Sequence, residues 1–302
     1  MTEKLGNALI YIVRCYPTFG RVQLVKTIFI ADLIHSNLCG TLMFPSEYMQ
    51  KQFGPVSCLA MNLTSSQFPQ PFLKTTQKII ETYNLYTYSP KVSEDLSDIP
   101  TYQLKILDAA ARFVQSKGRA TDISDFTHKF LLWKNTEPNT IIPEACFQLN
   151  NEDCSLLASE AGICLTPFAK EFCRAIQTTT NPSEIKVLLP KLSCAYPDNP
   201  LWDEWLDAYL AWDSAMMFCC TYAPESDTLD DLRDKGLELI AGITCSGTDP
   251  ERFLSAAIKY EQYFNQICDR ITPKEDIELS DSEKKSVNSV MQAARRELEL
   301  DE

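Results

Sequence analysis

The chain has 302 residues, enough for one large domain or about two of average size. Hydrophobic residues make up 45% and charged residues 23% of the chain, a composition that excludes global disorder. The nine glycines argue against an all-β fold with many turns and against Gly-rich nucleotide loops. The net charge of −13 disfavours nucleic acid as a partner, because an acidic chain repels phosphate backbones unless a basic patch reverses the field.

The first half begins with two predicted helices. Apolar residues recur at helical spacing from Leu5 to Tyr16, and Pro17 ends that helix. A second helix follows Gly20, and Gly40 fits its C′ position. This second stretch is the most apolar in the chain, but its charged residues argue against a membrane span, so we expect a buried helix.

Further along the first half, the sequence predicts mostly short helices. One begins at Ser46, another at the Gly-Pro-Val sequence of residues 54–56, and a third covers residues 72–83. The β-prone residues 85–88 predict a short strand. A helix capped by Ser97 or Asp98 runs to about Lys117, another covers residues 122–133, and residues 135–143 form a loop.

The second half repeats one helix-start signal, a capping residue followed by proline, at residues 166–167, 181–182, 199–200 and 249–250. Two long apolar stripes predict helices over residues 202–220 and 253–271. The chain turns polar from about residue 274, where a last helix is expected over residues 281–299. We therefore expect a mostly α fold with at most a small β element, divided into domains at 1–149 and 150–302.

Twelve cysteines occur at irregular spacing, without a C-x-x-C pair. A chain of this size does not need a disulfide scaffold, so reduced thiols in a cytoplasmic protein are the favoured interpretation, ahead of disulfides or a metal. The start of the chain lacks the basic and then apolar pattern of a secretory signal. With two histidines and no paired cysteine spacing, we expect no metal site, and no motif calls for a cofactor.

Three segments of the first half resemble the Panacea domain family, which is named for SocA-like antitoxins and phage-associated proteins. The first is the apolar helix that carries Lys26, Asp32 and His35. The second runs from Gly40-Thr-Leu-Met-Phe through Tyr48 to Phe53-Gly54-Pro55-Val56, and the third is Ile123-Ser-Asp-Phe-Thr-His128 followed by Trp133. The resemblance covers residues 5 to 147, and its lead-in is Leu-rich where the family has tyrosines. The second half resembles no family that we can name.

The resemblance implies a compact helical domain that neutralises a toxin by binding it. Members of the family are encoded beside varied bacterial or phage toxins, and some hand the toxin to a protease. The family-motif positions in this chain are Lys26, Asp32, His35, Gly54, Pro55, Val56, His128 and Trp133. In the family Gly54-Pro55 sets a rigid turn, and the resemblance favours a structural role for His128.

The same residues allow a catalytic alternative. Asp32 and His35 can share a helix face and could position a proton transfer, although a hydrogen-bonded pair at the edge of the core is favoured. Lys26 is interpreted either as a charge partner of Asp32 or of a neighbouring carboxylate, or as a solvated or snorkelling lysine. A nucleic-acid patch is disfavoured, because few aromatic residues lie among the basic residues and the net charge opposes it. These basic residues are Arg112, Lys117, Arg119, Lys129 and Lys134.

The stripe of Trp202, Trp205, Tyr209 and Trp212 holds three of the four tryptophans. Such a stripe is more often core, but any exposed part would be an anchor for a protein partner. The sequence thus predicts a protein-binding module of antitoxin type without catalytic residues or membrane association. Its partner would be a toxin encoded nearby. The alternatives are an enzyme that acts through Asp32, His35 and His128, and a phage-linked transcriptional regulator.

Overall fold

The computed structural model describes residues 2–67, 71–80, 83–178, 196, 199–223 and 227–271. Its helices are α1 (Thr2–Cys15), α2 (Arg21–Cys39), α3 (Cys58–Leu63), α4 (Thr101–Lys117), α5 (Ala120–Thr127), α6 (Leu131–Lys134), α7 (Asn151–Ala161), α8 (Pro167–Thr178), α11 (Trp202–Tyr222), α12 (Asp227–Cys245) and α13 (Pro250–Ile271), with short 3-10 turns η1 (Glu144–Phe147) and η2 (Ser246–Thr248). The strands are β1 (Tyr48–Lys51), β2 (Gly54–Ser57), β3 (Leu73–Ile80), β4 (Tyr83–Pro90) and β5 (Ile141–Ile142). The fold is mostly α with small antiparallel sheets, as the sequence predicts.

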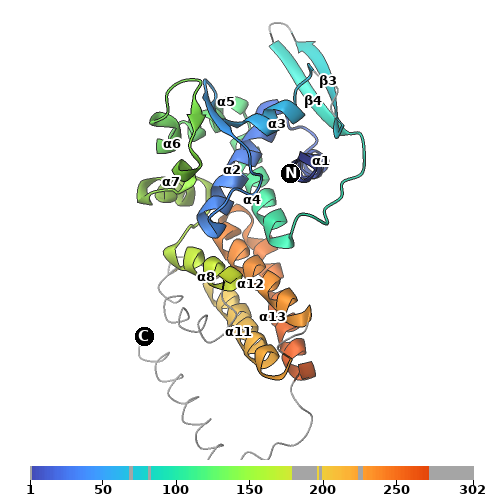
Figure 1. The fold of residues 1–302 in the computed structure, drawn as a ribbon, viewed down its shortest axis with the longest axis vertical. Coiled ribbons are helices and arrows are strands. Elements are labelled where there is room, and N and C mark those ends of the chain that lie inside the picture. The colour runs from blue at the N-terminus through green and yellow to red at the C-terminus, as the bar shows by residue number, and fades with distance from the viewer. Residues whose placement is uncertain are drawn as a thin grey trace, which may run out of the picture.

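The molecule is elongated, with an upper part built from α1 to α7 and a lower bundle of α8, α11, α12 and α13 (Figure 1). Helix α2 runs through the upper part, and its residues from Leu24 to Leu38 are all buried, as expected from its apolar sequence. Gly40 ends it in the left-handed conformation at φ 82°, which confirms the predicted C′ glycine. One continuous cluster of buried apolar side chains extends through both parts. The division at residues 149 and 150 stays a prediction.

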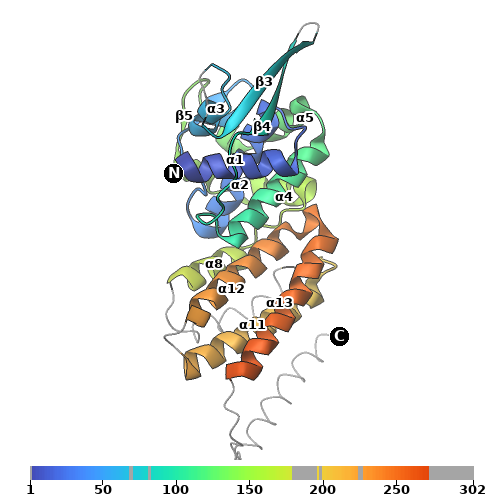
Figure 2. The same cartoon turned by 90° about the vertical axis from the view of Figure 1, so that its right-hand side faces the viewer.

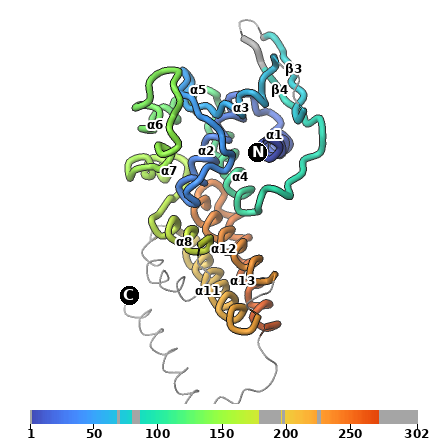
Figure 3. Tube along the Cα trace, in the orientation of Figure 1, coloured from blue at the N-terminus to red at the C-terminus, as the bar shows by residue number. Residues whose placement is uncertain are grey.

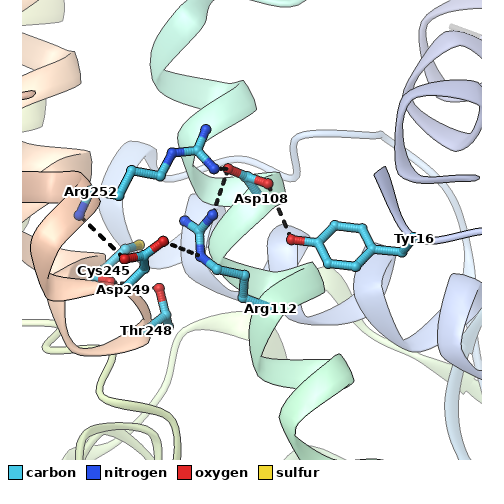
Figure 4. A network of polar contacts seen from close by, with 7 residues as sticks. All are labelled: Tyr16, Asp108, Arg112, Cys245, Thr248, Asp249 and Arg252. Atoms are coloured by element: carbon cyan, nitrogen blue, oxygen red, sulfur yellow. Dashed lines mark hydrogen bonds and ion pairs between the residues drawn. The ribbon is translucent and has the colours of Figure 1, made fainter. Parts of the chain in front are cut away.

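The two parts meet where α4 packs against α12. Beside this contact, Asp108 of α4 and Tyr16, which follows α1, face Arg252 of α13 (Figure 4). Asp108 on α4 is buried and forms ion pairs with Arg112, at 2.8 Å, and with Arg252 of α13. It also accepts a hydrogen bond from the hydroxyl of Tyr16, and Asp249 lies 3.9 Å from Arg112. This network, which we call the Asp108 junction, joins three elements that are far apart in the sequence.

Two helices predicted for the first half are wrong because their residues form strands, and a third begins later than predicted. Residues 46–51 contribute β1, and residues 54–57 form β2, so the helix after Gly-Pro-Val starts only at Cys58, where the Ser57 hydroxyl caps it. Strand β1 pairs antiparallel with both β2 and β5, and the last of these lies in the predicted loop. Short segments with mixed periodicity leave helix and strand undecided until pairing partners are known.

The predicted helix over residues 72–83 is strand β3, which pairs with β4 from Leu73↔Pro90 to Ile80↔Tyr83. Its Thr and Ile residues favour extended backbone, and β4 contains the predicted strand at 85–88. The hairpin projects from the upper part (Figures 2 and 3). The helix predicted over residues 122–133 is also interrupted, because α5 ends at Thr127 and α6 starts at Leu131.

The start signals at Pro167 and Pro250 open α8 and α13, and the one at residues 199–200 precedes α11 by two residues. Helix α4 starts at Thr101 rather than at the predicted caps Ser97 or Asp98. The signal at residues 181–182 and the predicted C-terminal helix over residues 281–299 lie outside the described residues. None of the described helices combines the length and apolar character that a bilayer span requires.

Candidate functional site

The turn between β1 and β2 gathers five of the predicted motif residues into one cluster. The buried Lys26 ammonium on α2 donates a hydrogen bond to the carbonyl of Pro55, at 3.0 Å. His128, just after α5, stacks on Trp133 of α6 with ring centroids 3.9 Å apart. The indole N–H of Trp133 donates to the carbonyl of Lys51, at 3.1 Å. We call these contacts, with Gly54, the turn cluster.

Gly54 is required by this geometry. Its φ of 96° lies in the region that only glycine adopts without strain, and a Cβ there would collide with Nζ of Lys26 and Oγ1 of Thr127. The glycine therefore allows the lysine to reach the backbone of β2. The next two motif residues, Pro55 and Val56, are buried within β2.

Lys26 is neither solvated nor paired with Asp32, so both sequence interpretations of it are wrong. It is 2% exposed, and among the described residues it forms no ion pair within 4 Å. Burial alone lowers the pKa of this lysine to about 7. Burial likewise lowers the pKa of His128, and the neighbouring charge of Lys26 acts in the same direction.

Asp32 is held apart from the turn cluster. Its carboxylate accepts hydrogen bonds from the amide of Phe44, at 2.8 Å, and from the hydroxyl of Tyr48, at 2.6 Å. Burial raises its pKa to about 7, although these two hydrogen bonds oppose the shift. The carboxyl group thus fixes the segment after α2 against the helix.

His35 lines a cavity of about 530 Å³ with Lys4, Cys39, Thr41, Tyr102 and Gln103. Its Nδ1 lies 2.6 Å from the carbonyl of Thr41, which can only accept, so Nδ1 carries the proton. Its Nε2 lies 3.0 Å from the side-chain nitrogen of Gln103 and therefore accepts from it. Burial lowers the pKa of His35, but hydrogen bonds and charge interactions, first among them the hydrogen bond with Cys39, raise it overall.

Asp32, His35 and His128 do not converge on one cavity. His35 lines the cavity just described, Asp32 is fully buried behind the segment that follows α2, and His128 belongs to the turn cluster. A proton relay through all three side chains is therefore not assembled in this structure.

The tryptophan stripe is core rather than an exposed anchor. Trp205, Tyr209 and Trp212 are at most 3% exposed, and the indole N–H of Trp212 donates to the carbonyl of Leu232 on α12. Trp202 is partly buried and stacks on Tyr196. A helix in the middle of a bundle buries more aromatic area than one in a thin layer, which is why the anchor interpretation fails for the first three.

Three of the five residues of the basic run form ion pairs. Arg112 belongs to the Asp108 junction, and Lys117 and Lys129 both pair with Glu160 of α7, at 2.9 Å and 2.5 Å. Within the part of the chain that is described, no group of three His, Cys, Asp or Glu side chains is arranged to hold a metal ion.

Sequence reasoning missed two features of the site. Phe53, at the tip of the β1–β2 turn, is 61% exposed, and Ile141, opposite Met49 on the same face of the sheet, is 54% exposed. Cys39 lies one helical turn after His35, a spacing that could have suggested their contact.

Comparison with protein-family models, curated proteins and solved structures found no match for this chain.

Proposed function

We propose that this protein is a binding module of antitoxin type, which neutralises or escorts a partner toxin by direct contact. The observation that carries the proposal is the exposed side chain of Phe53, on a turn whose backbone is hydrogen-bonded to side chains of α2 and α6. An aromatic side chain of this kind is the usual anchor of a protein interface, because it brings a large apolar area at a low cost in conformational entropy.

The turn cluster supports this role by holding the anchor in place before binding. Lys26 bonds to Pro55 and Trp133 bonds to Lys51, so the backbone on both sides of Phe53 is tied to helices. A preorganised turn loses little freedom when it docks, and more of the contact energy then appears as affinity. Ile141 extends the apolar surface on the same small sheet.

Charge favours a basic partner. The chain carries a net charge of −13, and complementary charge speeds association and excludes wrong partners. With the resemblance to the Panacea family, this suits a basic or nucleic-acid-directed toxin encoded beside the protein, in the cytoplasm. Delivery of that toxin to a protease would be consistent with the same resemblance.

The test is purification of the tagged protein from its native host. We expect a small protein encoded next to it to co-elute, and expression of the two together to rescue growth. Phe53→Ala should weaken the complex by at least about tenfold without loss of folding. Ile258→Ala, which removes an apolar side chain that is 42% exposed on α13, is the matched control and should bind normally.

Recovery of the protein alone, with no rescue of growth by the neighbouring gene, would count against the antitoxin role. Equal binding by the Phe53→Ala variant would show that another surface is used. A gel-shift experiment with the upstream DNA separates the remaining alternative, because a transcriptional regulator would retard that DNA and a protein-binding module would not.

A further inference from the structure

A pair of cysteine thiols lies at the contact between the upper part and the lower bundle. Cys39 is the last residue of α2, and Cys173 is in the middle of α8. Their side chains lie close enough to interact, and the side chains of His35 and Gln177 lie beside Cys39 as well. A further contact between the same helices, from Lys170 to Asn37 at 3.2 Å, keeps them in this register.

The two thiols differ in access and environment. Cys39 is half-buried and lines the cavity of about 530 Å³, whose exposed residues Thr41 and Pro45 open it to solvent. Cys173 is 2% exposed behind it. The neighbouring side chains, first that of Cys173 and then that of His35, lower the pKa of Cys39, whereas the pKa of Cys173 is raised. A small oxidant can therefore reach the more acidic thiol first.

We propose that Cys39 and Cys173 form a peroxide-sensitive pair, in which Cys39 is oxidised first and Cys173 resolves it into a disulfide between α2 and α8. This assignment is independent of the proposed binding function and goes beyond it. It rests on the contact between the thiols, on the neighbouring His35 and on the cavity that exposes only Cys39.

The chemistry balances with hydrogen peroxide as the oxidant. The Cys39 thiolate attacks one peroxide oxygen, the O–O bond breaks, and the leaving hydroxide takes up a proton to give water and a sulfenic acid. Cys173 then loses its proton, and its sulfur attacks the Cys39 sulfur, forming the S–S bond while the sulfenic hydroxyl leaves as a second water. Two thiols are oxidised and one peroxide is reduced.

The product would tie together two elements from different parts of the molecule. The disulfide would connect the end of α2, which leads toward β1 and the turn cluster, to α8 at the edge of the lower bundle. Thiol reductants would reverse the step, so the linkage is suited to sensing rather than to permanent stabilisation.

The experiment exposes the full, reduced protein to hydrogen peroxide and maps its peptides without reductant. In the wild type we expect the Cys39–Cys173 linked peptide to be the main oxidation product, and dithiothreitol to abolish it. Cys146→Ser, which removes an exposed cysteine, is the matched control and should give the same product. In Cys173→Ser, Cys39 should accumulate as a sulfenic acid that dimedone traps.

The proposal is overturned if the wild type oxidises at other cysteines while Cys39 and Cys173 stay unlinked. It is equally overturned if dimedone labels Cys146 in preference to Cys39 in the Cys173→Ser protein. The wild-type map alone decides the matter should a variant fail to fold. Neither result depends on whether a toxin partner exists, so the two proposals stand or fall separately.

Discussion

Two buried charges in the upper part of the molecule are handled in opposite ways. Asp108 meets two arginines and a tyrosine hydroxyl at the junction with the lower bundle (Figure 4). Among the described residues, the Lys26 ammonium forms no ion pair and donates one hydrogen bond, to the carbonyl of Pro55 in the turn cluster. Removing one partner of a buried ion pair lowers the free energy of unfolding, because the other charge is left buried without a counter-charge. A buried charge that has no counter-charge already lowers the free energy of unfolding through its own desolvation. We therefore expect the Asp108 junction to stabilise the protein and Lys26 in the turn cluster to destabilise it.

Breaking the junction should have the largest effect. Asp108→Asn removes the nearest counter-charge of Arg112, whose side chain is only 14% exposed. We expect the free energy of unfolding to fall by about 3 kcal/mol, the lower end for a buried pair, because Arg252 is half exposed. Urea unfolding measures the loss. Asp230→Asn removes the carboxylate of an exposed ion pair with Arg233 and should cost about 0.5 kcal/mol or less.

An equal cost for the two substitutions would contradict the comparison, because the junction would then behave as a surface pair.

Gly54→Ala is the next largest expected effect, and it tests how tightly the turn cluster is packed. The added Cβ would meet Lys26 and Thr127, and the backbone is held at φ 96°. We expect a loss of roughly 2 kcal/mol from strain and crowding together, measured by thermal unfolding. Gly40→Ala has a similar φ of 82° but open space around it, so it should cost only about 1 kcal/mol. A smaller loss for Gly54→Ala than for Gly40→Ala would refute the crowding argument.

Lys26→Met should stabilise the protein, and the gain should depend on pH. The pKa of Lys26 is about 7 in the folded protein and 10.5 when unfolded, so the unfolded chain binds more protons between these values. Stability of the wild type therefore rises with pH across that window, and below it the buried charge costs its full amount. The advantage of Met should shrink by roughly 3 kcal/mol between pH 6.5 and 9.5.

Urea unfolding at the two pH values measures this change. Lys129→Met, which alters a half-exposed lysine, is the control and should show little of it. A stability gain for Lys26→Met that does not change with pH would contradict the lowered pKa of Lys26 in the folded protein.

Asp32 should add a pH dependence of the opposite sign. Its folded pKa of about 7 lies above the unfolded value of 3.8, so the folded protein binds more protons between these values. This group therefore lowers stability as pH rises from about 4 to 7. Asp32→Asn should flatten that part of the stability curve, with a change smaller than that for Lys26. An unaltered curve would contradict the raised pKa.

The turn cluster also marks how far sequence reasoning reached. The motif positions Lys26, Gly54, Pro55, His128 and Trp133 were selected by resemblance, and the structure brings them together. The strands that bring them there were predicted as helices, because segments of four residues carry too little periodicity to choose between the two. Phe53 could not be selected, since exposure depends on what packs over a residue.

The sequence by itself determined the elements with long periodic patterns: the buried α2, the long helices α4, α11 and α13, and several of their boundaries at Gly or Pro. These follow from local propensity and from repeated burial of one face, which neighbouring residues specify. Only the tertiary structure decided that Lys26 has no carboxylate partner among the described residues, that Trp205 and Trp212 are core, and that Cys39 lies beside Cys173. Those facts depend on contacts between residues far apart along the chain, and no local pattern encodes such contacts.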